Sequence, residues 1–352
     1  MTGAERVVKA LKGQEHDMVP HFELIHDKNV REAILPGASY EDFIDYMDID
    51  GVLLFDKVFS WKYETVDESK KLVLDQWGAL VHFTSNSLGH CIERVIKTEK
   101  DFDKYVQPDP DEEWRYESMK KYVKRWKGRR AIIAHVTDVF DIVRESFFGD
   151  EAYYQTMFDN PGFIDRVNQV VLDYNLRSIK NQIELGADVL AVTGDFAMTT
   201  GPMVSPNHTA QFLTPATKKQ VELAHSLNVP AFKHTDGNIW KILDLLVDTG
   251  IDGLHPIDPM AGMDLAEVRA KYPDLCLMGN VNCGATLCWE SVEQVRQEVK
   301  QCIQKAGKGG RYICMSSNSI HSGVKPDNYL AMVKAIKKYG RYPLRLEGDK
   351  VL

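Results

Sequence analysis

Short apolar runs and longer amphipathic stretches alternate along the chain from about residue 130. The runs are apolar at almost every position, which is typical of strands buried on both faces of a parallel sheet. They span residues 130–138, 187–196, 229–237, 252–257, 275–281 and 311–317. The stretches between them, such as residues 163–186, repeat apolar side chains at helical spacing. This alternation predicts βαβ units that contribute to one parallel sheet.

Two earlier runs, residues 18–26 and 51–58, have the same apolar character and raise the number of expected strands to eight. No linker rich in proline, glycine or serine divides the chain. The pattern therefore favours an α/β fold, a single (β/α)8 TIM barrel that forms one domain over residues 1–352, over a doubly wound sheet. Before residue 18, charged and apolar residues at helical spacing predict an N-terminal helical segment.

Residues 62–98 depart from this alternation of strands and helices. Here polar and apolar residues alternate with a period of two, which is typical of antiparallel hairpins. We expect a β-hairpin excursion at about residues 62–98 that lies over the mouth of the barrel.

Composition and charge narrow the class of protein. Hydrophobic residues make up 44% of the chain and charged residues 27%, and no run approaches the roughly 18 apolar residues of a membrane span. The N-terminus lacks the apolar centre of a secretory signal, and the six cysteines form no CxxC pair, so we expect a cytoplasmic protein with reduced thiols and no membrane partner. A net charge of −8 without a lysine- and arginine-rich stripe argues against a nucleic-acid partner.

Polar side chains follow nearly every predicted strand. Because the chemistry of such barrels lies at the carboxyl ends of the strands, we expect these residues to share one pocket. They are Glu23, Asp56, Asp138, Asp195, His234, Asp236, His255, Asn280, Asn282, Cys283, Ser316, Asn318 and His321.

Several of these residues also have a purely structural interpretation. Asp138 and Asp236 each precede a helical pattern and can cap it. His255 can be a core histidine held by a backbone carbonyl group. Cys314, in the middle of a strand, can be a small apolar side chain.

His234 and Asp236 raise the question of a metal ion. Residues two apart on a strand point the same way, so these two side chains can share one cation or one substrate group. Zinc accepts imidazole, thiolate and carboxylate ligands, and Cys283, Cys314 and His321 are candidates for the remaining positions. A site without metal would instead use His234 or Asp236 as a general acid.

Several segments, taken in order, carry a resemblance to a known family. They are MTGAERVVKALKGQEHDMVP, DGVLLFDKVF, GADVLAVTGDFAM, PAFKHTDGN, GLHPIDP, LMGNVN and KPDNYLAMVKAIKKYG. The whole chain resembles the uroporphyrinogen decarboxylase superfamily in these segments. The resemblance implies a single (β/α)8 barrel and one of two activities: porphyrinogen decarboxylation or corrinoid-dependent methyl transfer.

The first loop separates these two activities. Decarboxylases of the superfamily carry an RQAGR motif there, whereas this chain has HFELIHDK, with Glu23 and no arginine. Asp56 resembles the family aspartate after the second strand, and Asn318 replaces the family histidine after the last strand. An acidic loop would repel the many carboxylates of a porphyrinogen, so the resemblance favours the methyltransferase branch. Zinc-bearing members of that branch carry H-x-C where this chain has His234, Thr235 and Asp236, so we do not expect a thiol acceptor.

We therefore predict a corrinoid-dependent methyltransferase or O-demethylase that acts on a small methylated, in particular methoxylated, substrate. The resemblance implies a corrinoid on a separate partner protein, since no DxHxxG module is present, and it also suggests a homodimer. The alternatives are a decarboxylase of a porphyrinogen or another polycarboxylate, and a non-catalytic barrel that binds a tetrapyrrole or a corrinoid protein. The candidate catalytic residues are His234, Asp236, Glu23 and Asp195. The candidate substrate-binding residues are Asp56, His255, Asn280, Asn318, Phe196 and Met198.

Overall fold

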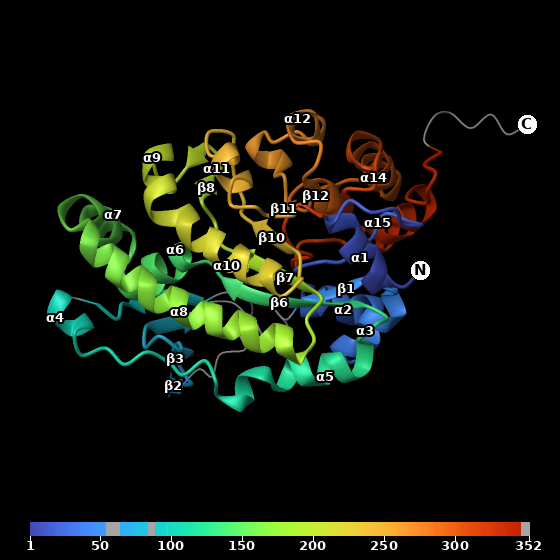
Figure 1. Ribbon diagram of the computed structural model, residues 1–352. Helices are drawn as coiled ribbons and strands as arrows, with labels where there is room; N and C mark the ends of the chain where they lie inside the picture. Colours follow the sequence, from blue (N-terminus) through green and yellow to red (C-terminus); the bar gives the residue numbers. More distant parts are fainter. Residues whose placement is uncertain (54–63, 84–88, 97, 346–352) are drawn as a thin grey trace, which may run out of the picture.

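A parallel sheet of seven strands forms the centre of the computed structural model, which describes residues 1–53, 64–83, 89–96 and 98–345. The sheet curls, and its order is β1-β6-β7-β10-β11-β12-β13 (Figure 1). Its strands are β1 (Gly51–Leu53), β6 (Ala131–Thr137), β7 (Val189–Thr193), β10 (Ala231–His234), β11 (Gly253–His255), β12 (Cys276–Val281) and β13 (Tyr312–Ser316). All of them are lined by buried apolar residues, and this confirms the α/β class and seven of the predicted strands.

Residues 18–26 do not form the expected eighth strand. They lie between the two edges of the sheet and bond to each edge through one backbone carbonyl group: the Pro20 carbonyl accepts from the Cys314 N–H at 3.0 Å, and the His21 carbonyl accepts from the Asp50 N–H at 2.8 Å. Pro20 has no N–H to donate to a ladder. The Glu23 carboxylate binds the Ser316 N–H at 3.0 Å, a position where a strand would place a backbone carbonyl group. The barrel-like ring is thus completed by an irregular segment.

Helices cover the outer side of the sheet (Figure 1). Those of the first half are α1 (Gly3–Leu11), α2 (Lys28–Ile34), α3 (Tyr40–Met47), α4 (Glu99–Phe102), α5 (Glu117–Trp126), α6 (Val139–Ile142), α7 (Asp150–Asp159) and α8 (Pro161–Leu185). Those of the second half are α9 (Pro206–His208), α10 (Thr214–Ser226), α11 (Leu243–Val247), α12 (Leu265–Lys271), α13 (Thr286–Trp289), α14 (Val292–Ala306) and α15 (Pro326–Tyr339). Shorter helical turns are η1 (Glu113–Tyr116), η2 (Val143–Phe148), η3 (Thr209–Leu213) and η4 (Pro259–Ala261).

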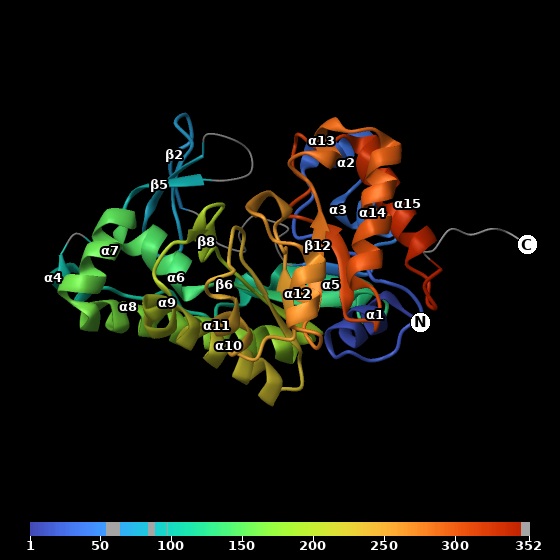
Figure 2. The same ribbon diagram turned by 90° about the horizontal axis from the view of Figure 1, so that it is seen from above.

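Helices from the two ends of the chain pack together on one side of the molecule. The predicted N-terminal helix is α1, which begins with a capping box between Thr2 and Glu5. The N-terminal helices α2 and α3 lie on the same side of the molecule as the C-terminal α14 and α15 (Figure 2), and α15 contacts α2. No helix of the described residues is long and apolar enough to cross a membrane.

A second, antiparallel sheet confirms the predicted hairpins. Its order is β2-β3-β4-β5, with strands β2 (Glu64–Asp67), β3 (Leu72–Leu74), β4 (Leu80–Phe83) and β5 (Gly89–Glu93). The sheet projects from the body of the molecule (Figure 2). It is anchored by Trp77, which is 1% exposed and packs against Phe147 of η2 and Tyr174 of α8. Because η2 follows β6, the excursion lies beside the carboxyl ends of the parallel strands.

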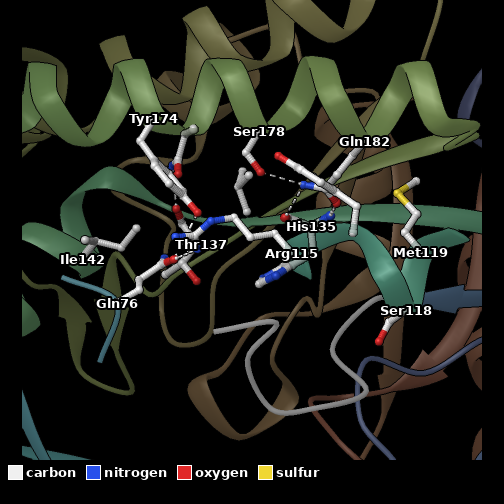
Figure 3. A pocket seen from close by; sticks show the side chains of 13 residues that line it. Gln76, Arg115, Ser118, Met119, His135, Thr137, Ile142, Tyr174, Ser178 and Gln182 are labelled. Atoms are coloured by element: carbon white, nitrogen blue, oxygen red, sulfur yellow. Dashed lines mark hydrogen bonds between the residues drawn. The ribbon is translucent and has the colours of Figure 1, made fainter. Parts of the chain in front are cut away.

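Side-chain amides of α8 bind the backbone of β6. The Gln182 side chain accepts from the His135 N–H and donates to the His135 carbonyl group, both at 3.0 Å, as two groups of a neighbouring strand would. The Asn175 amide donates to the Thr137 carbonyl at 2.8 Å. A cavity of about 60 Å³ adjoins this contact, and its lining includes Arg115 and Tyr174 (Figure 3).

Candidate functional site

Three neighbouring strands, β7, β10 and β11, carry the candidate site at their carboxyl ends. Asp195 follows β7, His234 ends β10, Asp236 comes two residues later, and His255 ends β11. The pairing of Thr193 with His234 and of His234 with His255 brings these ends to one level of the sheet. Asp195, His234 and Asp236 each offer a ligand atom, and these atoms lie within 4.8 Å of one another.

Backbone hydrogen bonds hold the loops after β7 and β10 together. The Asp236 N–H donates to Asp195 Oδ1 at 2.8 Å, and the Phe196 N–H donates to the Thr235 hydroxyl at 2.8 Å. Gly237 allows this close approach: its φ is +90°, and a Cβ atom there would lie 2.6 Å from the Ala197 carbonyl oxygen. The glycine of the HTDG segment is therefore needed to place both carboxylates.

His234 and His255 form a bonded pair. Their Nδ1 atoms are 2.8 Å apart, and His255 Nε2 lies 3.2 Å from the Ser316 carbonyl oxygen. His234 Nε2 faces the two carboxylates, 4.0 Å from Asp195 Oδ1 and 3.9 Å from Asp236 Oδ1. Burial lowers the pKa of both imidazoles below the usual range. His255 is completely buried, so it contacts His234 rather than a substrate.

Asp236 has one carboxylate oxygen held and one free. Asn318 Nδ2 donates to Oδ2, whereas Oδ1 is buried and has no hydrogen-bond partner among the described residues. Burial and the nearby carboxylates of Asp195 and Asp258 raise the pKa of Asp236. Three acids thus converge at this point, and an oxygen without a partner faces the space between them.

This arrangement fits a divalent metal ion. One imidazole nitrogen and two carboxylate oxygens at such distances are ligands that zinc accepts, and three protein ligands leave a position open. A cation would also satisfy the unpartnered Asp236 Oδ1. The predicted pair of His234 and Asp236 is therefore together, and the third member of the cluster is Asp195.

The predicted thiolate ligands lie elsewhere. Cys314 is completely buried in β13, and burial raises its pKa well above the usual range. The Cys283 sulfur accepts from the Ser317 hydroxyl at 3.3 Å, and His321 Nε2 bonds to the Cys283 carbonyl at 3.1 Å. Among the described residues, none of these three side chains belongs to the candidate metal cluster of Asp195, His234 and Asp236.

Glu23 lies in the core behind the site. It is 1% exposed and accepts from the Ser316 hydroxyl at 2.5 Å. His21 Nδ1 is 3.8 Å away. Burial raises the pKa of Glu23 to about 8. Among the described residues, Glu23 is linked to the site through Ser316, whose carbonyl group accepts from His255, and its side chain has no surface to offer a substrate.

The predicted substrate-binding residues separate into different places. Asn318 lies at the cluster, because its side chain donates a hydrogen bond to Asp236. Met198 is 62% exposed on β8 (Ala197–Met198), which pairs with β9 (Gly201–Pro202). The Phe196 ring is completely buried, since it packs against Phe140 and the Lys233 ammonium group. It has no surface on which a substrate could lie.

Asn280 faces the helices rather than the cluster. Its side chain donates to the Ile257 carbonyl at 2.9 Å, accepts from the Cys302 thiol of α14, and lines a groove of about 570 Å³ beside that helix. Asp56, the remaining predicted substrate-binding residue, lies outside the described residues.

The sequence analysis did not single out a buried ion pair beneath the site. Lys233 of β10 and Asp138 are both fully buried, with Lys233 Nζ 3.2 Å from Asp138 Oδ2. A lysine inside the apolar run AFKH was the signal for this pair. Asp138 also accepts from the Phe140 N–H at 3.0 Å, so the expected helix-capping role is confirmed.

These features define a TIM-barrel-like protein whose candidate site lies at the carboxyl ends of its strands. A family model described as "Uroporphyrinogen decarboxylase (URO-D)" matches residues 71–339. The chain therefore belongs to the uroporphyrinogen decarboxylase family.

Similar proteins carry two different names. Uroporphyrinogen decarboxylase of Psychromonas ingrahamii is 22% identical over 302 residues, which cover 82% of this chain and 78% of the relative. That of Hydrogenovibrio crunogenus is 23% identical over 274 residues, 74% of each chain. A methyltransferase from Methanosarcina mazei has a similar structure, with a TM-score of 0.75 and 16% identity over 96% of this chain and 99% of the other.

Proposed function

We propose that this protein is a corrinoid-dependent methyltransferase that takes a methyl group from a small methylated, in particular methoxylated, substrate. The observation that carries the proposal is the cluster of Asp195, His234 and Asp236 with an unpartnered, buried carboxylate oxygen. The likeness of the fold to that of the Methanosarcina mazei methyltransferase is compatible with this activity.

The charge of the site favours a neutral substrate over a polycarboxylate. Burial and the carboxylates of Asp195 and Asp258 raise the pKa of Asp236. The hydrogen bond from the neutral Asn318 side chain lowers it. Two unit charges 4 Å apart near a protein surface repel each other by about 4 kcal/mol. A substrate with several carboxylates would therefore be repelled by the described residues around Asp236, whereas a methyl ether would not.

A divalent ion such as zinc would be held by Asp195, His234 and Asp236. When bound, it would supply a Lewis acid for the oxygen atom that loses the methyl group. The chain's own residues fix the ligands in place: the Asn318 amide holds one oxygen of Asp236, and the Asp236 N–H holds Asp195. The cluster contains no thiolate, which agrees with a reaction at oxygen.

The methyl acceptor in this proposal is a reduced corrinoid on a separate protein. The sequence contains no DxHxxG segment that would bind cobalamin within this chain. The partner would reach the substrate from the side of the carboxyl ends of the strands, since the interior of such a barrel is filled by side chains.

A donor screen tests the proposal. Zinc-loaded protein is mixed with cob(I)alamin and a panel of methoxylated and methylated small molecules, and formation of methylcobalamin is followed by absorbance. We expect turnover with at least one donor, loss of turnover in Asp236→Asn, and unchanged turnover in Asp274→Asn, whose side chain is 93% exposed. Absence of methyl transfer across the panel, with zinc bound, would contradict the proposal.

A second candidate function is decarboxylation of a porphyrinogen or another polycarboxylate. The names of the relatives at 22% and 23% identity favour it. Incubation with uroporphyrinogen decides between the two: release of carbon dioxide and formation of coproporphyrinogen would support decarboxylation and overturn methyl transfer as the main activity.

A further inference from the structure

We infer that His255 is a positioning residue that fixes the tautomer of His234 and so turns the lone pair of His234 Nε2 toward Asp195 and Asp236. The inference rests on the proposed metal site, because it explains how one ligand of that site is prepared. His255 itself is completely buried and acts through His234.

The first step is the proton on His255 Nε2. This atom lies 3.2 Å from the Ser316 carbonyl oxygen, and a carbonyl oxygen can only accept a hydrogen bond. His255 must therefore carry a hydrogen on Nε2. Ser316 is itself held in place, because the Glu23 carboxylate accepts from both its N–H and its hydroxyl group.

The second step is the proton between the two rings. His255 has no exposed surface, and its described contacts are His234 and a backbone carbonyl group, so a charged ring there would be poorly solvated. A neutral His255 with its hydrogen on Nε2 has a lone pair on Nδ1. The Nδ1 atoms of the two rings are 2.8 Å apart, so the hydrogen between them belongs to His234.

The third step is the outward face of His234. With its hydrogen on Nδ1, a neutral imidazole has a lone pair on Nε2. This atom faces Asp195 Oδ1 at 4.0 Å and Asp236 Oδ1 at 3.9 Å. Lone pairs from three side chains then converge, which is an arrangement that a bound cation stabilises.

The alternative placement of the ring hydrogens would have a different result. If His255 carried both ring hydrogens, it would donate to His234 Nδ1, and His234 would present an N–H to the carboxylates. His234 would then donate to Asp195 and Asp236 and could not bind a metal ion through Nε2. The two arrangements differ in the position of one hydrogen, which can be measured.

Nuclear magnetic resonance of the metal-free protein at pH 8 reads this position directly. The protein is labelled with nitrogen-15 in histidine, and the signals of His234 are assigned by comparison with His234→Asn. We expect His234 with its hydrogen on Nδ1 and His255 with its hydrogen on Nε2. A hydrogen on His234 Nε2 in the wild-type protein would overturn the inference, whether or not any variant folds.

Two substitutions of His255 separate positioning from packing. His255→Leu removes the acceptor, so we expect His234 to populate both tautomers and zinc affinity to fall by about 10- to 100-fold, the effect typical of outer-sphere partners. His255→Asn can place its carbonyl oxygen near the position of Nδ1, so it should restore the tautomer and most of the affinity. Equal losses in both variants, or an unchanged tautomer in His255→Leu, would contradict the inference.

A matched control is His26→Leu. His26 is also buried, at 6% exposure, and bonds to the Tyr329 hydroxyl at 2.8 Å. Its loss should leave the His234 tautomer and zinc affinity unchanged. Because the tautomer is read without metal, substrate or corrinoid, a failure of methyl transfer leaves this result valid, and a wrong tautomer leaves the donor screen valid.

Discussion

Lys233 and His234 are neighbours on β10, yet their side chains lie in two different electrostatic environments. Lys233 Nζ lies 3.2 Å from Asp138, 2.9 Å from the Gly194 carbonyl oxygen and 4.1 Å from the centre of the Phe196 ring. Asp138 is also held by the Thr217 hydroxyl at 2.9 Å. On the Lys233 side, one cation and one anion balance, and each has hydrogen-bond partners.

The His234 side of the strand is not balanced. There the neutral imidazole of His234 faces Asp195 and Asp236, and Asp236 Oδ1 has no partner in the part of the chain that the structure describes. A buried ion pair whose two charges are matched is complete without a ligand, whereas converging acids with no cation among the described residues must keep a proton or bind a cation. The comparison supports a structural role for the Lys233 side and the binding role proposed above for the His234 side.

The largest expected effect is the loss of protein stability when the Lys233–Asp138 ion pair is broken. Lys233→Met leaves the Asp138 carboxylate buried without a cation, so we expect the free energy of unfolding to fall by about 3–5 kcal/mol. Urea unfolding measures this change. The double variant Lys233→Met with Asp138→Asn removes both charges and should recover part of the loss; a double variant as unstable as the single one would break the comparison.

The next largest effect is expected on the affinity for zinc at the cluster of Asp195, His234 and Asp236. Asp236→Asn should weaken zinc binding by about 100-fold or more, beyond the effect of outer-sphere partners, while the metal-free protein keeps or gains stability because one of three converging acids is neutralised. Titration calorimetry and urea unfolding give the two numbers. A large loss of stability without loss of zinc affinity would assign this side a structural role instead.

Glu23 shows a third way to bury an acid, in which the carboxyl group keeps its proton. Its pKa rises from 4.5 to about 8, so the folded state binds more protons than the unfolded state between these values, and stability should fall as pH rises through this window. Glu23→Gln should reduce this fall in the midpoint of thermal unfolding measured from pH 5 to pH 8 without abolishing it, because the raised pKa values of Asp141, about 7, and Asp236, about 8, contribute a fall in the same window. The control is Glu290→Gln, at an exposed glutamate, which should leave the dependence of the midpoint on pH unchanged. If Glu23→Gln also left this dependence unchanged, Glu23 would not be responsible for it.

The smallest expected effect sets the scale for exposed charges. Arg166 is 50% exposed and bonds to Glu99 and Asp103, both at 2.8 Å. Arg166→Ala should lower the free energy of unfolding by less than about 1 kcal/mol, as exposed ion pairs usually do. A loss as large as that of Lys233→Met would mean that burial does not distinguish the two pairs.

The sequence predicted the strands better than the directions of their side chains. Apolar runs located seven parallel strands because burial on both faces leaves little freedom of composition. Residues 18–26 escaped this rule because Pro20 has no N–H and a Glu23 side chain takes a ladder position. Phe196 and Asn280 were expected in the pocket but face away from it, since their directions depend on the local path of the chain at the strand ends, which no periodicity reveals.

The sequence placed Asp195, His234 and Asp236 in one pocket, but of these three it named only His234 and Asp236 as candidate metal ligands. His234 and Asp236 lie two apart, so their common direction follows from strand geometry. The third member, Asp195, comes from the loop after β7, and its approach depends on the register of Thr193 against His234 and on the turn at Gly237. Cysteines were expected in its place because thiolates are frequent zinc ligands, but Cys314 is enclosed in the core.

The two hydrogen bonds between the Gln182 side chain and the His135 backbone fix the position of helix α8 along strand β6. A side-chain amide can both accept from the N–H and donate to the carbonyl group of one residue without carrying charge. A shift of α8 by a single residue, about 1.5 Å along its axis, would break both bonds at once. The two hydrogen bonds of Gln182 therefore oppose any sliding of the 25-residue helix α8 along strand β6.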